Sequence, residues 1–244
     1  MLRVVECPEP GTLLREISRR VVAWEKENWV PYPWRVERTP YKVLIAEVLL
    51  KRTTRQAVSR EFPRFIEKFP SIEAIYVAPL EQVAEALKHL GLYWQRARQL
   101  KELAKVIVEK YGGKIPDDWS VLTELPGVGE YIAGAVLSFG YGKKAPVLDS
   151  NVARLLNRLT GRKAGKTEKY LDFLRLLLPD REVDYFNYGI IDLGAIVCHY
   201  RQPLCNRCPL RDLCVTYNVA NNTQRAECLD KAYNELLGYT QQLC

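Results

Sequence analysis

Four of the seven cysteines fall close together near the C-terminus, and their spacing constrains the fold more than any other feature of the chain. They are Cys198, Cys205, Cys208 and Cys214, in the pattern C-x6-C-x2-C-x5-C. Four clustered thiolates are typical of a metal site, and the alternatives are a zinc ion and an iron–sulfur cluster. Structural zinc sites usually have two short knuckles, whereas here one C-x2-C is flanked by longer, unequal spans. The spacing therefore favours an iron–sulfur cluster.

Hydrophobic periodicity predicts helices along nearly the whole chain. Residues 79–91 carry apolar side chains at helical spacing and end at a glycine, and residues 98–113 repeat this pattern. Further helices are expected at 12–27, 40–51, 57–68, 119–124, 131–140, 151–160, 168–178 and 185–197, with a packed terminal helix around Leu229 to Leu236. Long alternating β-branched runs are missing. The predicted class is therefore all-α.

Charge and composition restrict the function classes. Lys plus Arg number 36 against 29 for Asp plus Glu, which gives a net charge of +7. This balance suits a protein that meets phosphate, and equally a basic soluble protein. With only two histidines, Ser-His-Asp hydrolysis is hard to assemble and an H-E-x-x-H zinc protease is impossible. The chain has no membrane-length apolar run and no signal-peptide core, so we expect a cytoplasmic protein that binds no membrane. The single methionine and the plentiful charge fit a thermophilic source.

Two local features suggest binding or proton chemistry. In Leu125-Pro126-Gly127-Val128-Gly129, two glycines permit a sharp turn that leads into a helix N-terminus, which is either a phosphate site or an ordinary helix–helix turn. Glu47 is the one polar residue of an apolar helical stretch, 43–50. Its carboxyl group is expected in the protein interior, either with a raised pKa that suits proton transfer or as a salt-bridged core glutamate.

Asp149 is the third candidate, in Val147-Leu148-Asp149-Ser150-Asn151. It directly precedes an amphipathic helix, so an N-cap is the simplest interpretation. A carboxylate at this position could also act in catalysis.

Together, these features have the order found in one superfamily. The hairpin L-P-G-V-G, the aspartate in V-L-D-S-N-V and the cysteine loop resemble the helix-hairpin-helix DNA glycosylases with a [4Fe–4S] cluster, the group of endonuclease III and adenine DNA glycosylase. The resemblance runs from about Pro33 to Cys214, which is most of the chain. It favours the iron–sulfur cluster over zinc and a catalytic role for Asp149.

The resemblance implies two helical domains with double-stranded DNA bound in the cleft between them. A six-helix domain would span 34–143, a cluster domain would comprise 1–33 and 144–218, and 219–244 would form a C-terminal extension. Gly127, Val128 and Gly129 would hold a backbone phosphate. The target nucleotide would be flipped out of the duplex, and Asp149 would stabilise the cation that forms as the glycosidic bond breaks. The protein is expected to act as a monomer.

Several positions indicate which member the chain resembles. Bifunctional relatives carry a lysine where this sequence has Tyr131, so a monofunctional enzyme is expected. Adenine glycosylases and thymine/uracil–guanine mismatch glycosylases also have a glutamate at the position of Glu47, and in them this glutamate contacts the flipped base. The segment from Leu49 to Thr54, which includes Lys51, resembles the mismatch enzymes, and Arg52 would fill the gap left by the flipped base.

Base preference depends on further residues. Adenine glycosylases typically have glutamine where Tyr188 stands, and they usually continue into a large C-terminal domain, whereas few residues follow Asn218 here. Tyr188 and Arg55 are assigned to the base pocket. Removal of thymine or uracil opposite guanine is the predicted reaction. The alternatives are a compact adenine glycosylase acting opposite guanine or oxidised guanine, and a non-enzymatic iron–sulfur DNA-binding protein.

Overall fold

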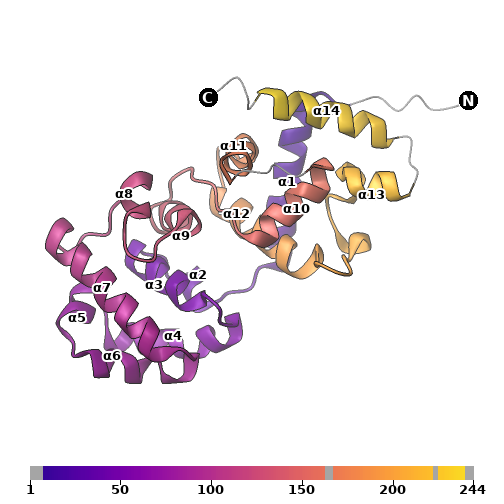
Figure 1. Ribbon diagram of the computed structural model, residues 1–244. Helices are drawn as coiled ribbons and strands as arrows, with labels where there is room; N and C mark the ends of the chain where they lie inside the picture. Colours follow the sequence, from indigo (N-terminus) through magenta and orange to yellow (C-terminus); the bar gives the residue numbers. More distant parts are fainter. Residues whose placement is uncertain (1–7, 163–166, 222–224, 240–244) are drawn as a thin grey trace, which may run out of the picture. The chain divides into compact units, whose positions relative to one another are not determined.

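The computed structural model describes residues 8–162, 167–221 and 225–239, and every regular element in these ranges is helical (Figure 1). The predicted all-α class is confirmed. The chain divides into two compact units. We call Val30–Lys143 the inserted unit and Met1–Trp29 with Lys144–Cys244 the cysteine unit, because the second contains all four clustered cysteines.

The inserted unit is built around one buried helix. In chain order its elements are α2 (Pro33–Val36), α3 (Pro40–Leu50), α4 (Arg55–Lys68), α5 (Ile72–Val77), α6 (Leu80–Ala86), the 3₁₀ helix η1 (Lys88–Leu90), α7 (Tyr93–Tyr111), α8 (Trp119–Thr123), α9 (Glu130–Ala135) and the π-helical turn η2 (Val136–Gly140). Residues 43–49 of α3 are all buried, and α3 packs against α4, α9 and η2. Gly140 permits this packing, because a Cβ there would lie 2.7 Å from the Cα of Pro40.

The cysteine unit collects helices from both ends of the chain. Its elements are α1 (Pro10–Asn28), α10 (Ser150–Thr160), α11 (Thr167–Leu177), α12 (Val183–Asp192), the π-helical turn η3 (Leu193–Val197), the 3₁₀ helices η4 (Cys205–Arg207) and η5 (Arg211–Leu213), α13 (Val215–Ala220) and α14 (Arg225–Tyr239). Helix α1 packs on α11, α12 and α14. The expected packed terminal helix is confirmed: α14 buries Leu229 and Tyr233, and the Tyr233 hydroxyl donates to the Leu213 carbonyl at 3.0 Å.

The observed helices differ from the expected ones in several places. The helix expected at 79–91 breaks after Ala86 and continues as η1, and Gly91, with φ +68°, ends it in a left-handed turn. The helices expected at 131–140 and 185–197 each finish in a π-helical turn. Helices α2, α5 and α13 were not expected, because four to six residues are too few to show a helical period.

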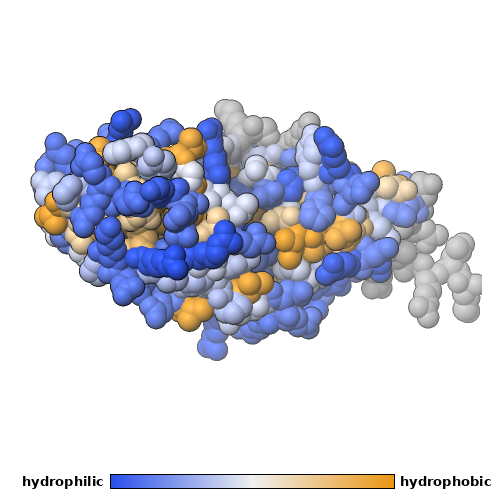
Figure 2. Space-filling view, turned by 90° about the horizontal axis from the view of Figure 1, so that it is seen from below, coloured by the Kyte–Doolittle hydropathy of each residue, from blue (hydrophilic) through white to orange (hydrophobic). Residues whose placement is uncertain are grey.

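The exposed surface is mostly hydrophilic. Figure 2 shows hydrophobic residues only in small separate patches on the visible face. Within the described ranges, no helix combines the length and the hydropathy needed to cross a membrane.

Candidate functional site

Asp149 caps helix α10, as its position in the sequence suggests. Its Oδ1 atom accepts a hydrogen bond from the Val152 amide at 2.7 Å, and its Oδ2 atom accepts one from the side-chain amide of Asn151 at 2.9 Å. The side chain is only partly buried. Two donors therefore fix the orientation of the carboxyl group at the positive end of the α10 dipole, where negative charge is favoured.

A chain of hydrogen bonds links this carboxyl group to the cysteine loop, which is the segment 198–214 that contains the four clustered cysteines. The Oδ1 atom of Asn151 accepts from Arg154 at 3.0 Å, and the Arg154 Nε atom donates to the Cys198 carbonyl, also at 3.0 Å. Gly194 allows η3 to approach α10 here, since a Cβ on it would lie 2.9 Å from the Asn151 carbonyl oxygen. Sequence reasoning missed Asn151 and Arg154, because the link depends on two segments meeting in the folded chain.

All four clustered cysteines line one cavity of about 320 Å³ with an almost entirely apolar wall. They are free thiols, and Arg158 donates to the Cys198 sulfur at 3.3 Å. Burial raises the pKa of Cys208 to about 12 and that of Cys214 to about 11. In the described part of the chain, no three metal-binding side chains converge closely enough to hold a single ion. The four thiols therefore share one cavity.

Glu47 and Tyr131 lie on two helices that pack together in the inserted unit, α3 and α9. The Glu47 side chain is 5% exposed, which confirms the expectation that it lies in the interior. Tyr131 is half-buried in the first turn of α9. The inserted unit therefore places a buried carboxyl group and a phenol on adjoining helices.

The hairpin between α8 and α9 uses its two glycines differently. Gly127 has φ +73°, the left-handed conformation that favours glycine. Gly129 has an ordinary φ of −99° and begins α9, with open space where a Cβ would stand. Val128 between them is buried. The Lys51 ammonium group donates to the Gly127 carbonyl, so the structure brings these two predicted DNA-binding residues together.

Arg52 occupies a strained turn after α3. The Thr53 amide donates to the Leu50 carbonyl at 3.2 Å, Lys51 has φ −57° and ψ 119°, and Arg52 has φ +53°. These values describe a type II turn with arginine at the position that favours glycine. Leu92 is a second exposed residue with this conformation, at φ +48° and 56% exposed, and its apolar side chain gave no signal in the sequence.

The two base-pocket candidates contact aromatic rings in their own units. The Arg55 guanidinium lies 6.0 Å from the centroid of the Tyr32 ring in the inserted unit. Tyr188 on α12 is 3% exposed and meets Trp29 edge-on, with the ring centroids 5.5 Å apart. The base-pocket assignment of both residues stays a prediction.

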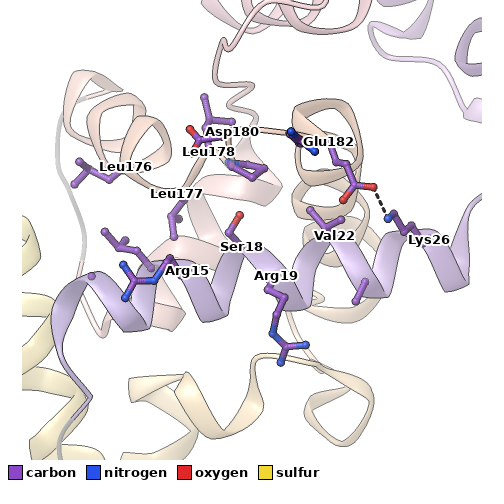
Figure 3. A pocket seen from close by; sticks show the side chains of 15 residues that line it. Arg15, Ser18, Arg19, Val22, Lys26, Leu176, Leu177, Leu178, Asp180 and Glu182 are labelled. Atoms are coloured by element: carbon purple, nitrogen blue, oxygen red, sulfur yellow. Dashed lines mark ion pairs between the residues drawn. The ribbon is translucent and has the colours of Figure 1, made fainter.

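A surface pocket of about 630 Å³ lies between α1 and residues 176–182 of the cysteine unit (Figure 3). The Ser18 hydroxyl points toward Leu178, and an ion pair between Lys26 and Glu182 crosses one end of the pocket. None of the predicted site residues lines it. The candidate chemistry therefore rests on the residues described above.

Known proteins with related sequences are DNA repair enzymes. The chain is 38% identical to the thymine-DNA glycosylase of Aeropyrum pernix over 84% of this chain and 96% of that protein. It is 39% identical to the thymine/uracil-DNA glycosylase of Methanothermobacter thermautotrophicus, over 76% and 86%. An adenine DNA glycosylase of Buchnera aphidicola is 34% identical, and the matched region spans 53% of it.

Structural similarity agrees with the sequence. A solved structure of a thermostable thymine-DNA glycosylase superposes with a TM-score of 0.81 at 34% identity, covering 85% of this chain and 97% of that one. A family model described as "HhH-GPD superfamily base excision DNA repair protein" matches residues 45–178, which include Glu47, the hairpin and Asp149. The chain therefore belongs to the HhH-GPD superfamily of base excision DNA repair proteins.

Proposed function

We propose that this protein is a monofunctional DNA glycosylase that removes thymine or uracil mispaired with guanine. The observation that carries the proposal is Asp149, a carboxyl group held by two donors at the head of α10 in a chain related to thymine-DNA glycosylases over nearly their whole length. Its substrate is double-stranded DNA with a mismatched base, and it acts as a cytoplasmic monomer.

Asp149 supplies the charge that the reaction needs. Breaking the N-glycosidic bond produces an oxocarbenium-like sugar, and a fixed carboxylate stabilises that cation and positions the attacking water. The donors on Asp149 hold both of its oxygens, so the carboxylate need not reorganise during the reaction.

Glu47, Tyr131 and Tyr188 are proposed to recognise the flipped base. A pyrimidine such as thymine or uracil presents O2 and O4 as acceptors, so its pocket needs donors. A protonated Glu47 carboxyl group and a tyrosine hydroxyl are such donors. Tyr131 offers no amine, and without an amine no Schiff base forms with the sugar. The expected product is an intact strand with an abasic site.

DNA contact is assigned to the hairpin and to the turn beside it. Gly127, Val128 and Gly129 form the turn that would hold a phosphate, and Lys51 adds positive charge at the Gly127 carbonyl. The Val128 amide donates to the Leu125 carbonyl at 3.0 Å, so the amides of Gly127 and Gly129 would be the donors. Arg52 is held out on its turn and would enter the duplex where the base has left. G:T and G:U pairs open at lower cost than Watson–Crick pairs, which adds selectivity before any pocket contact.

The four cysteines are proposed to hold a [4Fe–4S] cluster. All four thiols line one cavity of about 320 Å³, which has room for a cluster as well as for a single ion, and the spacing of the cysteines favours the cluster. The apolar wall and the Arg158 donor suit a cluster, because hydrogen bonds to sulfur and exclusion of solvent tune such centres. When bound, the cluster would order the loop that carries Arg201, Arg207 and Arg211 toward phosphate.

One assay separates the candidate functions. Labelled duplexes with G:T, G:U or adenine opposite oxidised guanine are incubated with the purified protein and resolved on a denaturing gel, with and without alkali. We expect strand breaks at G:T and G:U only after alkali. Adenine release with G:T untouched would support the compact adenine glycosylase. Binding with no base release from any duplex would support a non-enzymatic DNA-binding protein.

A further inference from the structure

The buried side chain of Arg96 contacts both strained turns of the inserted unit. It is 6% exposed and lies near the start of α7. Its Nη1 atom donates to the carbonyls of Val48 at 3.1 Å and Leu49 at 3.2 Å, in the last turn of α3. These carbonyls have no partner within their own helix, and a cation at a helix C-terminus is favourable.

The other donors of Arg96 reach the two turns themselves. Its Nη2 atom donates to the Lys51 carbonyl at 2.5 Å and to the Thr53 hydroxyl, on either side of Arg52. Its Nε atom donates to the Gly91 carbonyl at 3.1 Å, directly before Leu92. One guanidinium therefore fixes the peptide that precedes each left-handed residue.

The two residues that Arg96 supports are unusual in the same way. Arg52 and Leu92 are non-glycine residues with positive φ, and both are exposed. Each turn would be easier to form with glycine, so the side chains themselves must be what the turns present. One is a cation and the other is apolar. These are the two kinds of side chain that enter opened DNA, as a base substitute and as a wedge between base steps.

We propose that Arg96 is a positioning residue that sets the Arg52 and Leu92 turns as one rigid pair, so that both side chains enter the duplex together when the base is flipped out. The proposal rests on the proposed function, because it assigns these turns to DNA opening. The guanidinium of Arg96 carries its donors in a planar fork, and this geometry allows one side chain to hold four carbonyls and a hydroxyl. Lysine, with a single ammonium group, cannot reproduce this geometry.

The same helix supplies a matched control. Lys101, also on α7, donates to the carbonyls of Ile75 at 3.1 Å and Ala78 at 2.7 Å, at the end of α5. It holds a helix end in the same unit but no strained turn. A purely structural role for Arg96 predicts that Lys101→Met and Arg96→Lys have the same effects.

The test compares base release from a G:T duplex under single-turnover conditions with release from a short mismatched bubble, where the thymine is already unstacked. We expect Arg96→Lys to slow release from the G:T duplex about 100-fold. Release from the bubble and affinity for an undamaged duplex should change less than about threefold. Thr53→Val removes one contact at the edge of the network and should slow G:T release about tenfold.

Each outcome decides the proposal. Selective loss on the paired substrate in Arg96→Lys and Thr53→Val, with Lys101→Met near wild type, supports it. Equal losses on duplex and bubble, or equal losses in the Lys101→Met protein, overturn it. If the wild-type protein releases no thymine from either substrate, the proposed function itself fails, which is a different result from unaltered release by the Arg96 variant.

Discussion

Asp149 caps α10 and is the proposed catalytic carboxylate, two roles that are usually alternatives for an aspartate before a helix. One oxygen accepts from the Val152 amide and the other from Asn151, so the side chain both starts α10 and presents a fixed carboxyl group. Asparagine is as good an N-cap as aspartate, but it carries no charge. Stability and catalysis can therefore be separated at this residue.

Asp149→Asn should reduce base release about 100- to 1,000-fold, because the cation that forms at the sugar loses its counter-charge. The melting temperature and the affinity for DNA should stay close to the wild type. Asp118→Asn is the matched control, since Asp118 caps α8 by accepting from Val121 at 3.1 Å. Near-normal base release by the Asp149 variant would leave it only the capping role.

The strain at Arg52 gives a second prediction. A left-handed conformation costs a non-glycine residue about 1–2 kcal/mol. Arg52→Gly should therefore keep or raise the melting temperature while thymine release falls, and Arg52→Ala should lose activity without the gain in stability. The measurement is thermal unfolding beside single-turnover kinetics. A lower melting temperature for the glycine variant than for the alanine variant would contradict the strain.

The sequence predicts correctly those features that depend only on neighbouring residues in the chain. The burial of Glu47, the turn at Gly127 and the cap at Asp149 all follow from neighbours within a few positions. Arg96 and Arg154 could not be found in this way, because each donates to carbonyls about 40 residues away or more in the chain. Which backbone groups need a donor is known only after the helices have packed.

At the level of elements, the two glycines of the hairpin between α8 and α9 have different roles: Gly127 is required by the backbone conformation, whereas Gly129 leaves space for a ligand. A Cβ on Gly127 would lie 1.8 Å from the Gln99 amide nitrogen and would also meet a positive φ. A Cβ on Gly129 meets nothing within 4 Å. From the sequence alone, both glycines had the same expected role, and only their backbone angles and surroundings distinguish them.

Gly129→Ala should fold normally and bind DNA more weakly, since a methyl group would stand where a phosphate approaches the amides. The loss should be equal for matched and mismatched duplexes, because phosphate contacts carry no sequence information. Gly127→Ala should instead lower the melting temperature. Fluorescence anisotropy over a salt series checks this, with a wild-type log–log slope of about −0.9 per phosphate neutralised. Weaker binding to one mismatch alone would exclude the phosphate role.

Helix α1 is fastened to the cysteine loop by Arg20. This side chain donates to Asp212 at 2.5 Å, to the Pro209 carbonyl at 3.0 Å and to Glu16 at 2.7 Å. Hydrogen bonds from Arg19 and Arg20 lower the pKa of Glu16 from its ordinary 4.5 to about 2. The ionised form is therefore favoured by folding.

This shift predicts an acid sensitivity. The contribution of Glu16 to the free energy of unfolding is complete above its unfolded pKa of 4.5 and is lost as the pH falls toward 2. In urea titrations, the stability difference between wild type and Glu16→Gln should be largest near neutrality and shrink below pH 4.5. A difference that stays constant down to the acid limit would contradict the role assigned to this ion pair.

For the whole molecule, the two units should respond differently to loss of the proposed iron–sulfur cluster. The four cysteines belong to the cysteine unit, and the hydrogen bonds from Cys198 through Arg154 and Asn151 end at Asp149 in the same unit. Helix α3 and the hairpin lie in the inserted unit, whose core is its own.

Purified protein should contain about four iron and four sulfide per chain. Cys208→Ser should lose iron and lose protection from hydrogen exchange in α10 and the loop before it, whereas α3 should keep its protection. Stoichiometric zinc without iron after anaerobic purification would exclude the cluster. Equal loss of protection in α3 would show that the units do not respond separately.

During synthesis, α1 is made well before the helices against which it packs. Helix α1 leaves the ribosome before the inserted unit, whereas α11, α12 and α14, against which it packs, follow only after the whole inserted unit. At ordinary rates of synthesis this interval lasts roughly ten seconds. Throughout that time Ile17 and Val21, which are fully buried in the folded protein, are not yet covered by α11, α12 and α14. The ribosome therefore finishes synthesis of the inserted unit while the apolar face of α1 is still accessible to chaperones.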